Sequence, residues 1–385
     1  MISSDQQELL NLLRSSFFHE RINMNCDNWN EVMEEASTQA VAGFVFPVLP
    51  SEQKVKWYSQ DLQLKANFIR ILHEQENLCN IFQAADIPIV ILKGTSAAQY
   101  YPEPYRRSMG DIDFLVPHPL YCKARAVMLA NGYSFEYGET ENSRHIGFRK
   151  NGVLFELHRS FSSFDRDIEP LVLEGFDRRE IHSICGKEFP ALPDPVNGIV
   201  FLAHIRQHMF EEGVGLRHII DWMMFVHAYL TPEKWENEFK PLADCTGFTC
   251  FSKILTLMCK MYIGLPDPVP WCENADLSAA SELMEFVLNS GNFGRKAQKA
   301  AEQRQVEVVS RNIRSKGMLR YLQETGELRW SLLERHPKLR PFAWMYQTGR
   351  ILKAGLKSGL KIGDIRNNLR SGDKKGQLIK KLGLE

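Results

Sequence analysis

The sequence predicts an α+β fold, in which a small mixed β-sheet core is flanked by N- and C-terminal helical regions. Apolar residues recur every three to four positions at both ends of the chain, which is typical of amphipathic helices. Between them, short β-branched runs such as Ile87–Leu92 alternate with turn residues, which is typical of strands. We therefore expect four parts: an N-terminal helical region at 1–85, the sheet core at 86–190, a C-terminal helical domain at 191–330 and a basic segment at 331–385.

The elements of the core follow from local patterns, taken in chain order. Asn151-Gly152 lies between two alternating runs and predicts a β-hairpin over 145–158, because both residues tolerate positive φ. Gly132 lies at the C-cap position of the helix expected before it. The complete set of expected elements is a strand at 87–92, a helix start at 97–101, a strand at 111–116, a helix at 119–131, a strand at 133–137, the hairpin, and a second hairpin at 180–190 around Gly186.

Periodicity predicts helices on both sides of this core. The N-terminal stripe begins at Leu9, and a longer helix ends near Ala85. Prolines 47 and 50 interrupt the chain between them. Beyond the core, helices are expected at 196–210, 218–230, 232–242, 249–263, 276–289 and 296–324.

Composition limits the classes of function. The 385 residues carry a formal net charge of zero, so the whole chain has no field that would attract nucleic acid. The stretch from Arg350 to Glu385 is basic, with ten Lys and Arg against three Asp and Glu, and it lacks the interleaved aromatic residues of a single-strand-binding surface. None of the eight cysteines forms a C-x-x-C pair, which favours reduced thiols in a cytoplasmic protein. No apolar run reaches the ~20 residues that a membrane span needs.

Three acidic residues in strand patterns indicate a metal site. In Gly110-Asp-Ile-Asp-Phe-Leu-Val116, alternation places Asp111 and Asp113 on the same face of a strand. Two carboxylates on one face repel each other, and a hard divalent cation such as Mg²⁺ or Mn²⁺ relieves this repulsion. Glu156, flanked by apolar residues on the expected hairpin, would complete the cluster if the two strands are neighbours. Such clusters support in-line phosphoryl displacement.

Residues upstream of the acids are candidates for holding phosphates. Lys93, Gly94, Thr95 and Ser96 lie where a strand meets a helix, where glycine allows a close approach and backbone amides face an anion. Two arginines, Arg106 and Arg107, could bind further phosphates as bidentate donors, or could pair with Glu103 on the surface.

These residues together resemble a known family. The order of strand, Lys93-Gly94, helix, Asp111-Ile-Asp113 and a later acid resembles the polymerase-β-like nucleotidyltransferase superfamily. Tyr101-Pro102, Gly132-Tyr133 and Glu156-Leu-His158 make it similar, more narrowly, to a bacterial family of uncharacterised nucleotidyltransferases, over roughly 85–220. The resemblance implies that Asp111 and Asp113 bind metal, that Glu156 activates or orients the acceptor, and that Gly94 holds the triphosphate. The chain departs from the superfamily in having Thr95 directly after the glycine.

Several histidines have both functional and structural interpretations. His158 could orient the Glu156 carboxylate, contact the base or the acceptor, or be a satisfied core residue. His218 and Asp221 could line the cleft or pack within a helix. His204 and His208 lie one helical turn apart, as metal-ligating histidines do, but the sequence shows no third ligand.

The expected activity is Mg²⁺-dependent transfer of a nucleoside monophosphate from a nucleoside triphosphate, with ATP as the expected donor. The acceptor is a hydroxyl group of a small molecule or a protein, and pyrophosphate is released. Two alternatives remain open: a catalytically inactive scaffold that binds a nucleotide or a partner, and an antitoxin-like protein that nucleotidylates a toxin.

Overall fold

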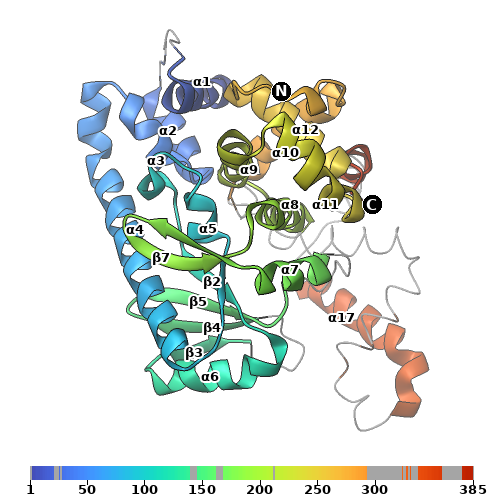
Figure 1. The fold of residues 1–385 in the computed structure, drawn as a ribbon. Coiled ribbons are helices and arrows are strands. Elements are labelled where there is room, and N and C mark those ends of the chain that lie inside the picture. The colour runs from blue at the N-terminus through green and yellow to red at the C-terminus, as the bar shows by residue number, and fades with distance from the viewer. Residues whose placement is uncertain are drawn as a thin grey trace.

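The described residues form one mixed β-sheet with helices against both faces, which confirms the predicted α+β fold. A computed structural model gives the arrangement shown in Figure 1. The structure describes residues 2–20, 26, 28–138, 145–161, 168–210, 213–292, 323, 327, 330, 337–357 and 375–384.

The N-terminal region is helical, as expected. Its first helix begins with a capping box, in which Gln6 N donates to Ser3 Oγ at 3.3 Å and Ser3 N donates to the Gln6 side chain at 3.0 Å. The fourth helix has 34 residues and runs along the full height of one side of the molecule in Figure 1. The helices are α1 (Ser4–Phe18), α2 (Trp29–Thr38), α3 (Ala42–Val45) and α4 (Ser51–Ala84), with a 3₁₀ turn at Phe46–Val48.

Seven strands in the described residues form the sheet, in the order β3-β4-β5-β2-β1-β7-β6. Strand β2 pairs antiparallel with β1 and parallel with β5, and β1 pairs parallel with β7. Both predicted hairpins are present, because their turn residues adopt positive φ: 50° at Asn151 and 76° at Gly152 in the first. The strands are β1 (Val90–Leu92), β2 (Asp111–Leu115), β3 (Ser134–Tyr137), β4 (His145–Lys150), β5 (Val153–His158), β6 (Glu180–Ile184) and β7 (Lys187–Ala191).

Three expected elements differ clearly from the structure in their extent. The helix expected to start over 97–101 begins three residues earlier and spans Gly94–Ala98, directly after Lys93. The strand expected from Ile87 begins only at Val90, because Pro88 has no N–H for a sheet hydrogen bond. The helix expected over 232–242 is divided by a π-helical turn at Trp235–Phe239, next to Pro241, which cannot donate a helical hydrogen bond.

The remaining helices mostly match the expected ones. Helix α7 has no counterpart among them, and the helix expected at 296–324 lies outside the described residues except for position 323. The helices are α5 (Gly94–Ala98), α6 (Tyr121–Ala130), α7 (Ile168–Asp177), α8 (Asp194–Phe210), α9 (Leu216–Tyr229), α10 (Pro232–Lys234), α11 (Lys240–Cys245), α12 (Thr249–Ile263), α13 (Leu277–Ser290) and α17 (Ala343–Lys357). Short 3₁₀ segments lie at Pro104–Arg106, His118–Leu120, Pro270–Cys272 and Pro337–Phe342.

Each face of the sheet contributes to a separate hydrophobic core. On one face, Ile112 and Phe114 pack with residues of α4 and α6 such as Phe82 and Met128. On the other face, Leu92 and Leu115 join the core formed by the flanking helices. The described end of the basic segment also enters this second core, through Leu378, Ile379, Leu382 and Leu384. Among the described helices, none combines the length and apolar character needed to cross a membrane.

Candidate functional site

The three predicted acids come together on one face of the sheet. Strand β2 pairs parallel with β5, and in this register Asp113 lies directly opposite Glu156. Asp111 lies two residues earlier on β2 and therefore shares the face of Asp113. One carboxylate oxygen from each of the three residues lies within 4.8 Å of the other two. This donor set of hard oxygens fits Mg²⁺ or Mn²⁺.

The negative charges of the three acids are only partly compensated by neighbouring positive charges and hydrogen bonds. Burial raises the pKa of Asp111 to about 6, and repulsion from Asp113 and Glu156 adds to the rise. Burial also opposes ionisation of Asp113, but the charge of Lys93 and a hydrogen bond from His158 outweigh it and lower that pKa. A divalent cation would relieve the repulsion that remains at Asp111.

Lys93 is the cation closest to this cluster among the described contacts. It follows β1 directly, and its Nζ lies 3.0 Å from Asp113 Oδ1. Its backbone has φ 50° and ψ −133°, a conformation that non-glycine residues rarely adopt. Burial lowers its pKa, but the charges of Asp113, Glu156 and Asp111 outweigh that effect and raise it, so Lys93 is charged.

Three further side chains surround Glu156 and Asp113. His158 Nε2 lies 2.8 Å from Asp113 Oδ1 and 3.5 Å from Glu156 Oε2. The Tyr137 hydroxyl donates to Glu156 Oε1, and His145 Nε2 lies 3.7 Å from the same oxygen. Sequence patterns did not identify Tyr137 or His145, because their proximity to Glu156 depends on the register between β3, β4 and β5.

The residues that follow Lys93 connect the site to the helices around it. The Thr95 hydroxyl donates to Gln75 Oε1 of α4 at 2.5 Å, and Ser96 Oγ donates to Asn197 Oδ1 of α8 at 3.0 Å. Both side chains are buried. Their hydroxyls could bind a triphosphate only after exchanging these partners, so Lys93 and the Gly94 backbone are better placed for that role.

Both candidate arginines contact carboxylates. Arg106 Nε lies 2.6 Å from Glu103 Oε2, the pairing that was one of its two expected alternatives, and Arg106 Nη1 lies 3.5 Å from Asp61. Arg107 is buried and forms a bidentate pair with Asp221, with both N–O distances at 2.7 Å. The Tyr101 hydroxyl donates to the same Asp221 carboxylate at 2.7 Å. Asp221 thus joins α9 to the segment that precedes β2.

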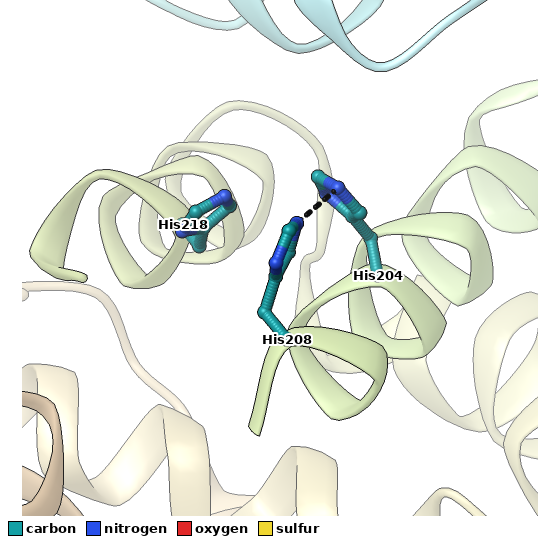
Figure 2. Close-up of side chains that lie close together, drawn as sticks. All are labelled: His204, His208 and His218. Atoms are coloured by element: carbon teal, nitrogen blue, oxygen red, sulfur yellow. Dashed lines mark hydrogen bonds between the residues drawn. The ribbon is translucent and has the colours of Figure 1, made fainter. Parts of the chain in front are cut away.

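The other candidate cleft residue, His218, lies near the two histidines of α8. Figure 2 shows His204, His208 and His218 converging from α8 and α9. The sequence offered no third partner for His204 and His208, and the structure provides one in His218. Arg217 beside it, which no sequence pattern singled out, donates to the Ser108 carbonyl at 3.0 Å.

Comparison with known proteins places this geometry in context. A family model described as "Uncharacterised nucleotidyltransferase" matches residues 25–264. The solved structure of an antigenic nucleotidyltransferase-like protein from Paracoccidioides brasiliensis is similar at 16% sequence identity and a TM-score of 0.31. That match covers 46% of this chain and 84% of the fungal one. A comparison with curated proteins gives no match.

Proposed function

Because the chain belongs to the family of uncharacterised nucleotidyltransferases, we propose that it transfers a nucleoside monophosphate from a nucleoside triphosphate to a hydroxyl acceptor. The observation that carries the proposal is the convergence of Asp111, Asp113 and Glu156 on one face of the sheet, with one oxygen of each within 4.8 Å of the others. ATP is the proposed donor, and the acceptor is a hydroxyl of a small molecule or a protein.

The roles of the residues follow from their positions. Asp111 and Asp113 would hold Mg²⁺, with Glu156 as third ligand or as general base for the acceptor hydroxyl. When bound, Mg²⁺ supplies charge neutralisation at the phosphate oxygens. The acceptor oxygen forms a bond to the α-phosphorus, the bond from that phosphorus to the bridging oxygen breaks, and pyrophosphate leaves. Where Glu156 acts as the general base, the acceptor proton passes to its carboxylate.

Lys93 has a position suited to the triphosphate. Its Nζ contacts Asp113 Oδ1, so a phosphate oxygen that shared a metal with Asp113 would lie within its reach. Because Lys93 is charged and only 16% of its side chain is exposed, it would stabilise negative charge more strongly than a fully exposed lysine. We propose that it exchanges Asp113 for a phosphate oxygen when metal and nucleotide bind.

Calorimetry with each of the four nucleoside triphosphates, with and without Mg²⁺, tests the proposal. We expect Mg²⁺-dependent binding of at least one nucleotide by the wild type, and its loss in Asp111→Asn/Asp113→Asn, which keeps side-chain size but removes both charges. Glu136→Ala, on the same sheet but in an exposed ion pair with Arg149, is the matched control and should bind as the wild type does.

The opposite outcome favours a different function. Nucleotide binding that ignores both Mg²⁺ and the aspartate variants, or no binding at all, would exclude the catalytic assignment and leave the scaffold alternative. Once binding is established, an acceptor screen with labelled nucleotide, on small molecules and on candidate protein partners, identifies the second substrate.

A further inference from the structure

A cluster of three histidines lies outside the carboxylate site. His204 and His208 lie one turn apart on α8, and His218 lies near the start of α9 (Figure 2). One ring nitrogen from each lies within 4.8 Å of the other two. The ring centroids are 4.4 Å apart for His204 and His208, 5.1 Å for His204 and His218, and 4.7 Å for His208 and His218.

The surroundings keep these imidazoles neutral. Burial lowers the pKa of all three, and the charge of Lys93 lowers those of His204 and His208 further. For His208 the pKa falls to about 3. At His218 the charge of Arg217 adds to the effect of burial. A neutral imidazole carries the nitrogen lone pair that a metal ion requires.

We propose that His204, His208 and His218 form a binding site for a transition-metal dication of the Zn²⁺ type, separate from the Mg²⁺ site on the sheet. Imidazole nitrogen suits Zn²⁺, Cu²⁺ and Ni²⁺, whereas Mg²⁺ prefers oxygen. Three histidines with a fourth position left for a small ligand are an established zinc ligand set.

His204 and His208 need only a small adjustment to bind one metal ion, whereas the ring nitrogen of His218, which lies within 4.8 Å of theirs, would have to move closer. His204 Nε2 and His208 Nε2 lie 2.8 Å apart, which is a hydrogen bond between neutral rings. Two nitrogens bound to one tetrahedral zinc at ~2.0–2.1 Å would lie roughly 3.3 Å apart. Rotation of either side chain by a few tenths of an ångström at its tip therefore converts the hydrogen-bonded pair into a pair of ligands.

Two cations near the cluster, Lys93 and Arg217, favour a negatively charged fourth ligand on the metal. Arg217 Nη2 lies 3.2 Å from His218 Nε2 and would have to move aside if that nitrogen bound the metal. Each cation has carboxylates nearby: Lys93 pairs with Asp113, and the charges of Asp221 and Asp111 act on Arg217. The remaining positive charge weakens the affinity for a bare dication and favours an anionic fourth ligand, such as hydroxide or a phosphate oxygen.

Titration of tag-free, EDTA-treated full-length protein with Co²⁺ and Zn²⁺ tests the site. We expect one Co²⁺ per chain with the visible absorption of a tetrahedral centre, displaced by Zn²⁺, and three nitrogen ligands in X-ray absorption of the zinc form. His204→Gln/His208→Gln should weaken Zn²⁺ binding by at least about 100-fold. Loss of a residue that only hydrogen-bonds to a metal ligand typically costs about 10–100-fold in affinity, and loss of the ligands themselves should cost more.

Two controls separate this site from the proposed nucleotidyltransferase site. The variant Asp111→Asn/Asp113→Asn should lose Mg²⁺-dependent nucleotide binding but still bind Zn²⁺. The variant His73→Gln, at an exposed histidine, should bind both the nucleotide and Zn²⁺ as the wild type does. If the double histidine variant does not fold, Zn²⁺ binding by His218→Gln and X-ray absorption of the wild type test the site in its place. No Zn²⁺ on the wild type, or Zn²⁺ with oxygen ligands only, or equal binding by the histidine variants, overturns the proposal.

Discussion

Lys93 Nζ lies 3.0 Å from Asp113 Oδ1, so a lysine contacts the same carboxylate that is proposed to bind metal. His158 Nε2 lies 2.8 Å from that oxygen, so Asp113 has two partners at a single atom. Without these partners, the three carboxylates, of which Asp113 is buried and Asp111 and Glu156 are half-buried, would repel one another at close range. Lys93 therefore acts as the counter-ion of the cluster in the metal-free protein, and it competes with a dication for Asp113.

Replacement of Lys93 by methionine should have opposite effects on metal and nucleotide. Removal of the competing charge should tighten the binding of Mn²⁺, measured in the absence of nucleotide, by about tenfold. Two unit charges near 4 Å apart interact by ~1 kcal/mol in water and by ~4 kcal/mol in a partly buried environment. Nucleotide binding should weaken, because the triphosphate loses a cation. Calorimetry at pH 8 measures the affinity for Mn²⁺ and the affinity for nucleotide. The control is Lys187→Met, which removes a lysine that pairs with Glu76 at the surface. Weaker Mn²⁺ binding in Lys93→Met would contradict the competition.

The sequence predicts the acidic cluster well because its geometry is local. Alternation along one strand places Asp111 and Asp113 on the same face. The Asn151-Gly152 turn fixes the hairpin that presents Glu156. Only the adjacency of β2 and β5 requires more than local information, because no residue pattern within either strand specifies its neighbour.

The contacts of the arginines and histidines could not be predicted in this way. Arg107 pairs with Asp221, 114 positions further along the chain, and no local pattern marks a partner at that separation. His218 comes ten positions after His208, beyond one helical face, and meets it only because α8 and α9 pack against each other. Helix α7 is a different case, because its buried residues Ile168, Leu171, Val172 and Phe176 recur every three to four positions, a helical pattern that the sequence itself contains.

The pair of Arg107 and Asp221 should contribute to stability rather than to phosphate binding. Both side chains are buried, so Arg107→Met or Asp221→Asn alone leaves a buried charge without its partner and should cost about 3–5 kcal/mol of unfolding free energy. The double variant Arg107→Met/Asp221→Leu should lose less than the sum of the two. Urea unfolding measures these values. A loss below about 1 kcal/mol in Arg107→Met, together with weaker nucleotide binding, would instead favour the phosphate-binding interpretation.

Gly147 should be required for the position of Tyr137. A Cβ atom at Gly147 would lie 2.5 Å from Tyr137 Cε1, so no larger residue fits while the Tyr137 hydroxyl reaches Glu156. Gly147→Ala should lower the unfolding free energy by about 1–3 kcal/mol, the usual cost of overpacking. In a Tyr137→Ala background the same change should cost less than half as much, because the clashing ring is gone. Equal costs in both backgrounds would show that Tyr137 does not set the limit.

The histidine cluster should make the metal-free protein labile to mild acid. The pKa of His208 is about 3 in the folded protein against 6.5 for the free side chain, so above pH 6.5 both the folded and the unfolded states leave it neutral. As the pH falls below 6.5, His208 becomes protonated in the unfolded chain but stays neutral in the folded one. The free energy of unfolding therefore declines by at most about 1.4 kcal/mol per pH unit for each such histidine, until the pH reaches the pKa of that histidine in the folded protein. Urea unfolding of EDTA-treated protein between pH 7 and pH 4 should therefore show a shallower decline for His208→Gln than for the wild type. Exposed His73→Gln should follow the wild type, and equal slopes for all three proteins would mean that His208 takes up its proton in the folded state.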